Sequence, residues 1–281
     1  MKQLISVKKK QMDDYFNYLR HEEHSELTIQ KYSRDIARFL ACSNGHLDKS
    51  AIMEWRAALV ADGYAPQTIN SMLAAVNGLL DYLGHSDQKV KPIKCQRAMF
   101  RSRERELTKA EYLRLLDTAK RQGKRRLFLV LQTICATGIR VSELKYITVQ
   151  AIQDGQAVVS CKGKCRVILI PRKLCRELLG WVRGKGIAAG PVFQTSGGNT
   201  LDRSNIWREM KGLCGAAGVD PRKVFPHNLR HLFAMVFYTA EKDIAKLADI
   251  LGHSSISTTR IYIMETGAEH ERQLSRLGLV L

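Results

Sequence analysis

A set of basic residues and one tyrosine in the second half of the chain has the types needed for chemistry on a phosphodiester. The set consists of Arg140, Lys162, Lys164, His227, Arg230, His231, His253 and Tyr262. Breaking a phosphodiester requires cations that neutralise the non-bridging oxygens, and a guanidinium group binds phosphate through two parallel hydrogen bonds. It also requires an in-line nucleophile and a general acid for the leaving oxygen. The two arginines, the tyrosine, and the lysines with the histidines are candidates for these three functions.

Taken singly, each residue has an ordinary structural explanation. Arg140 follows the turn at Gly138 and can pair with Glu143 in the next turn. His227 is a common type of residue at a helix start, and His253 fits a tight turn. The two lysines fit the exposed tip of a hairpin. The chemical interpretation therefore depends on whether the fold brings these residues together.

The sequence predicts neither a metal site nor a cofactor. No carboxylate cluster accompanies the candidate residues, and nucleophilic attack by Tyr262 does not need a metal-activated water. The seven cysteines are scattered and include no C-x-x-C pair. We therefore expect no disulfide framework and no zinc site, and a reducing compartment, the cytoplasm, is the expected location.

The charge favours a polyanionic partner. The net charge is +18 and the isoelectric point is near 9.8. Residues 1–103 contribute +5 and residues 104–281 contribute +13, so both parts could contact the same nucleic acid. No uninterrupted apolar run of about 18 residues and no signal peptide are apparent, so we expect no membrane association.

The first 86 residues are predicted to form a compact helical bundle. Residues 27–42 place Leu27, Tyr32, Ile36, Phe39 and Leu40 on one stripe. Residues 65–84 repeat this pattern and end at Gly84, a typical helix end. Two further helices are expected over residues 7–20 and 48–63. Residues 87–103 are basic and lack periodicity, which indicates a linker that is either solvated or follows a phosphate backbone.

Residues 104–281 are predicted to form a second, mainly helical domain with a small antiparallel sheet. Thr108 and Glu111 have capping-box spacing at the start of a helix. An almost wholly apolar helix follows and stops at Gly138, and another helix is expected from about Ile139. The Asp154-Gly155 pair and the turn at Gly163 predict about three strands over residues 149–171.

Four ordered motifs in this domain resemble the tyrosine recombinase (phage integrase) family. They are ATGIRVSEL (136–144), CKGKCRVILIP (161–171), HNLRHLFA (227–234) and LGHSSISTTRIY (251–262). The helical bundle before them resembles, on a looser pattern, the SAM-like core-binding domain of the same family. The resemblance implies a site-specific recombinase that cleaves and rejoins DNA through a 3′-phosphotyrosyl link, without a nucleotide cofactor.

The resemblance also implies roles for the candidate residues. Arg140 and Arg230 correspond to the arginines that clamp the phosphate, with Glu143 supporting Arg140. His227 belongs to the H-x-x-R pair with Arg230, His231 is a supporting residue, and His253 corresponds to the later histidine that contacts the phosphate. Tyr262 corresponds to the nucleophile. Lys162 corresponds to the general acid, although the short CKGKC turn leaves Lys164 as an alternative.

The family further implies double-stranded DNA with inverted-repeat core sites as the substrate. A homotetramer on two such sites is expected to form from subunits that are monomeric in solution, with accessory proteins as possible partners. The apolar residues Leu274, Leu277, Val280 and Leu281 predict a C-terminal tail that docks on the neighbouring subunit, although it could fold back on its own domain. The outcome could be integration, excision, inversion or resolution, and the gene could belong to a mobile element or serve chromosome upkeep. The expected location is the cytoplasm of a prokaryote, in association with the nucleoid.

Three other functions remain open at this point. A DNA-binding protein without catalysis would explain the charge and the helices but not the ordered set of catalytic residue types. A metal-dependent nuclease would lose cleavage in EDTA. A type IB topoisomerase uses similar chemistry, but it would relax supercoiled DNA without a specific site.

Overall fold

A computed structural model describes residues 8–95, 104–161, 164–195, 197–262 and 275–277 of the chain. The chain divides into two compact units, residues 1–97 and 98–281. Each unit has a hydrophobic core of its own. Among the described helices, none is long and apolar enough to cross a bilayer.

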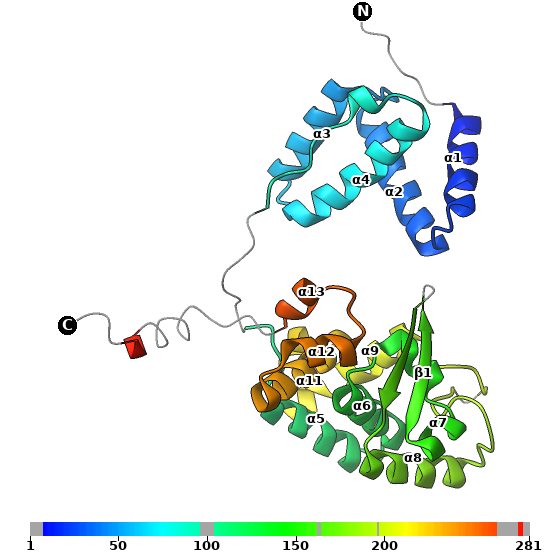
Figure 1. Cartoon of the computed structure of the whole chain (residues 1–281), viewed down its shortest axis with the longest axis vertical. Coiled ribbons are helices and arrows are strands. Elements are labelled where there is room, and N and C mark those ends of the chain that lie inside the picture. Colours follow the sequence, from blue (N-terminus) through cyan, green and yellow to red (C-terminus); the bar gives the residue numbers. More distant parts are fainter. Residues whose placement is uncertain (1–7, 96–103, 162–163, 196, 263–274, 278–281) are drawn as a thin grey trace, which may run out of the picture. The chain divides into compact units, whose positions relative to one another are not determined.

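The first unit is a bundle of four helices (Figure 1). They are α1 (Lys9–His21), α2 (Glu26–Cys42), α3 (Lys49–Ala61) and α4 (Pro66–Tyr82). The predicted bundle is therefore confirmed, and α4 is followed by Gly84 in the left-handed conformation, at φ +78°. One residue of the predicted stripe on α2 was placed wrongly, because Leu27 is 77% exposed and the neighbouring Ile29 is buried instead. Leu27 and Ile29 both lie in the first turn of α2 but point to opposite sides of the helix, and the core is on the side of Ile29.

The start of the predicted linker packs on α4. After the short 3₁₀ helix η1 (Ser86–Gln88), the backbone of Val90 exchanges two hydrogen bonds with the side chain of Asn77. The backbone of Ile93 does the same with Asn70. Two asparagines on one face of α4 thus hold this stretch, and Val90 is buried in the core.

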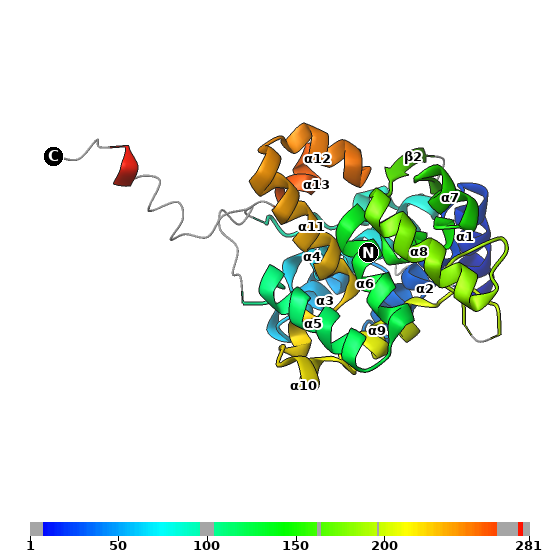
Figure 2. The same ribbon diagram turned by 90° about the horizontal axis from the view of Figure 1, so that it is seen from below.

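The second unit is built around α6 (Arg125–Thr137), which has its largest interhelical contact with α11 (Pro226–Glu241). Helix α5 (Lys109–Arg121) begins at the predicted capping box of Thr108 and Glu111. Helix α6 ends at Gly138, at φ +64°, as predicted. The remaining helices are η2 (Val141–Tyr146), α7 (Val149–Asp154), α8 (Arg172–Lys185), α9 (Arg203–Lys211), α10 (Cys214–Ala217), η3 (Pro221–Lys223), α12 (Ile244–Leu251) and α13 (Ile256–Arg260). Figures 1 and 2 show α11, α12 and α13 stacked on one side of the unit.

The small sheet has two strands in the described residues, not the predicted three. Strand β1 (Gln156–Cys161) pairs with β2 (Lys164–Leu169) in an antiparallel register. The segment expected to form the other strand is helix α7, which Thr148 caps and Gly155 ends at φ +73°. Asp-Gly suits both a hairpin turn and a helix end, because each needs a residue with positive φ. The helix expected from Ile139 is the 3₁₀ helix η2, for which Arg140 is the N-cap.

Candidate active site

A buried carboxylate fixes two arginines at the start of η2. Glu143 is 3% exposed, and its carboxylate accepts a hydrogen bond from Nη1 of Arg140 at 2.8 Å and one from Nη2 of Arg166 at 2.6 Å. It also accepts the backbone N–H of Arg140 at 2.8 Å. Burial acts to raise the pKa of Glu143, but the bonds from Arg140 and the charge of Arg166 outweigh it and hold the pKa below its usual range. Glu143 is therefore ionised at neutral pH, and the Arg140 side chain remains 42% exposed.

The second predicted arginine is almost completely buried. Arg230 is 2% exposed on α11, and its guanidinium donates to the carbonyl oxygens of Gly138 and Leu251. Burial first, and then the positive charge of Arg140, lower the pKa of Arg230 to about 10, and Arg166 acts in the same direction. The hydroxyl of Tyr262 acts to raise it. Three guanidinium groups thus lie within electrostatic reach of one another, with Glu143 as the carboxylate bonded to two of them.

His253 links Arg230 to the segment that carries the tyrosine. Its Nε2 lies 3.0 Å from Nη2 of Arg230, and its Nδ1 lies 2.8 Å from Oγ1 of Thr259 on α13. Burial first, and then the charges of Arg230 and Arg140, lower the pKa of His253 to about 4. The ring is therefore neutral at pH 7. With Arg230 as the donor at Nε2, the Nδ1–H is directed to Thr259.

Tyr262 is surrounded by the three predicted histidines. Its side chain is 6% exposed, and its hydroxyl lies 3.5 Å from Nε2 of His227. The tyrosine ring stacks on His253 at 13° with centroids 5.6 Å apart, and the rings of His227 and His231 lie at 5.6 and 5.2 Å. His231 is buried, with Nε2 3.9 Å from a carboxylate oxygen of Glu106.

An open hollow of about 410 Å³ lies beside these groups. Arg140, His227 and Arg230 form one part of its wall. Arg203 and Trp207, which are one turn apart on α9, form another part. The hollow therefore presents cationic groups to any molecule that enters it, and His227 in its wall lies 3.5 Å from the hydroxyl of Tyr262.

The structure brings together most of the residues that the sequence singled out. Arg140, Glu143, His227, Arg230, His231, His253 and Tyr262 form one connected cluster. Lys162 lies outside the described residues. Lys164 is the first residue of β2, but its side chain is not among the parts of the chain that the structure describes. The choice between the two lysines therefore stays a prediction. Of the apolar residues in the expected tail, only Leu277 is described, and it is exposed.

Arg166 is the residue that sequence reasoning missed. It reaches from β2 to Glu143 and also donates to the carbonyl of Ile250 at 2.6 Å. A Cβ atom added to Gly252, which has φ +65°, would lie 2.3 Å from Cδ of Arg166. Its signal in the sequence was the close spacing to the lysines of the CKGKC turn. Apart from this spacing, the sequence does not distinguish an arginine on a strand that points into the site from one that points to solvent.

Within the described residues, no group of three or more His, Cys, Asp or Glu side chains could hold a metal ion. The site instead consists of three arginines, two of them paired with Glu143, together with three histidines and a phenol. Such a site favours an oxyanion with several acceptor oxygens, since guanidinium groups bind phosphate through paired hydrogen bonds.

Two family models cover most of the chain. Residues 105–269 match the model described as "Phage integrase family". Residues 12–86 match "Phage integrase, N-terminal SAM-like domain". The first match alone extends over more than half of the sequence and includes the whole residue cluster described above.

Similar proteins span nearly the full length of the chain. Tyrosine recombinase XerA of Thermococcus kodakarensis is 28% identical over 271 residues, which are 93% of each chain. Tyrosine recombinase XerC of Pseudomonas entomophila is 29% identical over 276 residues, 90% of each chain. In fold, the chain resembles a lambda integrase tetramer bound to a Holliday junction, with a TM-score of 0.74 and 18% identity. That match covers 93% of this chain and 78% of the other.

Proposed function

This chain belongs to the phage integrase family and is an enzyme of the tyrosine recombinase type, and we propose that Tyr262 is the nucleophile with which it cleaves and rejoins DNA at specific sites. The phenol oxygen attacks the phosphorus, a 3′-phosphotyrosyl bond forms, and the bond from phosphorus to the 5′ oxygen breaks. The 5′ hydroxyl of a partner strand reverses the step. No energy-rich cofactor is consumed, because each step exchanges one phosphodiester for another.

The remaining roles are assigned by what each group can donate or accept. Arg140 and Arg230 neutralise the non-bridging oxygens in the pentacoordinate transition state. His227, whose Nε2 lies 3.5 Å from the Tyr262 hydroxyl, accepts the phenol proton, a distance that can shorten when substrate binds. His253, as a neutral ring, accepts a hydrogen bond from Arg230 and so orients this guanidinium toward the phosphate. Lys162, with Lys164 as the alternative, protonates the leaving 5′ oxygen.

One observation carries this proposal: Arg230 is buried beside both Arg140 and the Tyr262 hydroxyl. Burying a guanidinium near two others costs free energy in the absence of a bound phosphate. The like charges repel, and hydrogen bonds within the protein only partly replace the hydration that the guanidinium loses. A phosphodiester placed between these arginines relieves the repulsion. It also brings the phosphorus next to the phenol oxygen.

The substrate and the assembly follow from the same proposal. The substrate is double-stranded DNA with inverted-repeat core sites, and the active form is a homotetramer assembled from monomers on two such sites. Similar folds support this, since one solved relative is a tetramer on a Holliday junction and another is the XerH recombinase bound to its difH substrate. The same proposal includes action on the nucleoid in the cytoplasm with accessory proteins as possible partners, either on a mobile element or in chromosome upkeep.

The proposal is tested by trapping the covalent intermediate. A pool of duplexes with a nick and a randomised inverted repeat is incubated with the protein in EDTA, and covalently bound DNA is recovered after denaturation. We expect an adduct on a subset of sequences, and Tyr262→Phe should abolish it without loss of DNA binding.

Each alternative function gives a different result in this experiment. A DNA-binding module forms no adduct on any sequence, and a metal nuclease cleaves only when EDTA is omitted. A type IB topoisomerase forms adducts without sequence selection and relaxes arbitrary supercoiled plasmids. Any of these outcomes contradicts the proposed recombinase.

A further inference from the structure

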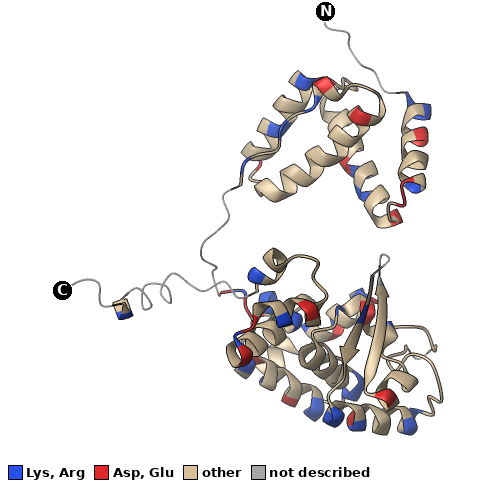
Figure 3. Ribbon diagram, in the orientation of Figure 1, with Lys and Arg blue, Asp and Glu red and all other residues tan. Residues whose placement is uncertain are grey.

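The outer face of α8 has features that the proposed recombination chemistry does not use. The buried face of this helix carries Leu174, Cys175, Leu178 and Val182. The opposite stripe, at intervals of three and four residues, carries Lys173, Arg176, Glu177, Gly180 and Gly184. Figure 2 looks onto this side of the unit, and Figure 3 shows its Lys and Arg residues in blue. We call this stripe, with Arg125, Trp181 and Lys185, the α8 face.

Neither the backbone conformation nor the internal packing of the chain requires glycine at positions 180 and 184. Glycine lowers helix stability relative to alanine, most strongly in a helix interior. Neither Gly180 nor Gly184 has a positive φ, and a Cβ atom added to either would meet no atom within 4 Å. Gly138 and Gly252 differ, because an added Cβ atom there would collide with a side chain. The bare surface at Gly180 and Gly184 therefore suits an approach by another molecule.

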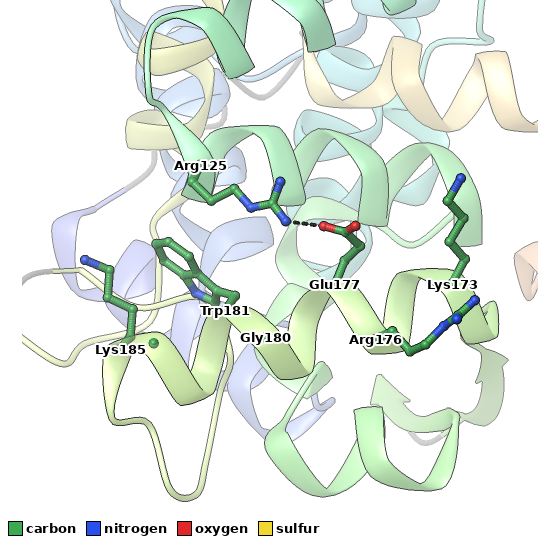
Figure 4. Close-up of a pocket in the computed structure, with 8 residues that line it drawn as sticks. Arg125, Lys173, Arg176, Glu177, Gly180, Trp181 and Lys185 are labelled. Carbon is green, nitrogen blue, oxygen red and sulfur yellow. Dashed lines mark hydrogen bonds and ion pairs between the residues drawn. The ribbon is translucent and has the colours of Figure 1, made fainter.

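A hollow of about 690 Å³ lies directly over these glycines. Figure 4 shows Arg125, Lys173, Arg176 and Lys185 around it, with Trp181 between Arg125 and Lys185. Glu177 is the one carboxylate in its lining, and it is paired with Arg125. Four cations and one carboxylate leave a local charge of +3. None of the residues that line this hollow lines the hollow at Arg140 and Arg230.

We propose that the α8 face is a docking site for an acidic helical segment of a partner protein. Small residues one helical turn apart allow two helix backbones to approach closely, and the cations beside them pair with carboxylates on the partner. Trp181 supplies an apolar flank, and its ring already lies 5.2 Å from the Lys185 ammonium. Duplex DNA fits less well, because the hollow is small relative to a duplex.

The first test asks whether the fold itself needs the glycines. Gly180→Ala and Gly184→Ala, separately and together in the full chain, are expected to raise the melting temperature, with the larger increase at Gly180 in the helix interior. A lowered melting temperature in the single variants would mean that the glycines serve internal packing. That result would overturn the inference before any partner is considered.

The second test uses a defined probe with the full-length protein. The probe is a fluorescein-labelled, end-blocked 16-residue peptide of alanine, leucine and glutamate, with the glutamates along one helical stripe. A matched peptide carries lysine in place of glutamate. By fluorescence anisotropy at low salt we expect the acidic peptide alone to bind. We also expect at least tenfold weaker binding by Arg176→Glu and by the double variant Gly180→Leu/Gly184→Leu.

A charge-matched control separates this site from the general positive charge of the chain. Lys94→Glu, in the other unit, changes the net charge by the same amount as Arg176→Glu and is expected to alter peptide binding less than twofold. Equal weakening by both variants, no binding of the acidic peptide, or unaffected binding by the double variant contradicts the proposal. A 16-bp duplex that binds wild type but loses affinity in the α8 variants would instead identify a DNA-contact surface. None of these measurements depends on the adduct at Tyr262, so the two proposals fail independently.

Discussion

At the scale of single residues, the site is a cluster of cations that the protein partly neutralises. Glu143 is buried and bonded to Arg140 and Arg166, whereas Arg230 is held by the carbonyl oxygens of Gly138 and Leu251. Carbonyl groups fix the guanidinium in place without cancelling its charge. Arg230 therefore keeps its positive charge although it is almost completely buried, and a charge in such surroundings stabilises a transition state more strongly than one in water.

Replacing Arg230 with lysine tests this arrangement. An ammonium group has the charge but not the planar geometry that bonds two carbonyl oxygens and a phosphate together. We expect Arg230→Lys to bind duplex DNA within a few-fold of wild type and to form the covalent adduct about 10²- to 10³-fold more slowly. Single-turnover rates on a nicked site measure the effect, and a wild-type rate would rule out the clamp role.

The low pKa of His253 gives a prediction for stability against pH. The pKa is about 4 in the folded protein, against 6.5 for a free histidine, so the unfolded chain binds more protons between these values. Stability is therefore expected to fall as pH decreases from about 6.5 to about 4. His253→Gln should flatten part of this slope, measured by urea unfolding between pH 4.5 and 6.5, above the range of most carboxylates. An unchanged slope in His253→Gln would contradict the assignment of this pH dependence to the His253 ring.

At the scale of elements, the sequence predicted the helices well and the connections between them less well. Thr108 with Glu111, Gly84 and Gly138 mark helix ends through local geometry, and each prediction is confirmed. Gly155 was misread, because positive φ is common to hairpin turns and helix ends. Arg166 was missed for a different reason: its partners Glu143 and Ile250 are 23 and 84 residues away in sequence. Only the folded chain shows that this arginine ties three site segments together.

The contact between Arg166 and Gly252 gives a prediction about coupling. Gly252→Ala introduces both a positive-φ strain of about 1–2 kcal/mol and a clash with the Arg166 side chain of similar size. We expect a loss of about 3 kcal/mol of unfolding free energy in the wild-type background. In the Arg166→Ala background the clash is absent, and the loss should fall to about 1–2 kcal/mol.

Urea unfolding of the two single variants and the double variant measures this coupling. Gly155→Ala is the matched control, because that glycine also has positive φ but an added Cβ atom would meet nothing within 4 Å. Its effect should be the same with and without Arg166. Strict additivity of Gly252→Ala and Arg166→Ala would contradict the contact.

At the scale of the whole molecule, the two units have separate cores and share a positive net charge. Composition alone predicted a polyanionic partner, since both parts of the chain are basic. Composition could not say which cations face that partner. The structure separates the cations around Arg140 and Arg230 from those on the α8 face, and we expect these two groups to behave differently toward DNA.

The salt dependence of DNA binding tests this separation. If both units together neutralise about 6–10 phosphates, affinity should fall about 10³- to 10⁵-fold between 50 and 200 mM salt. The measurement uses Tyr262→Phe, so that no covalent product distorts the equilibrium. Arg140→Gln, which removes an exposed guanidinium at the site, should lower the slope of log K against log salt by about one. Lys173→Gln removes one charge from the α8 face and should leave the slope unchanged. A shallow slope for the parent protein, or equal effects of the two substitutions, would show that the cations at the site are not the ones that meet the DNA backbone.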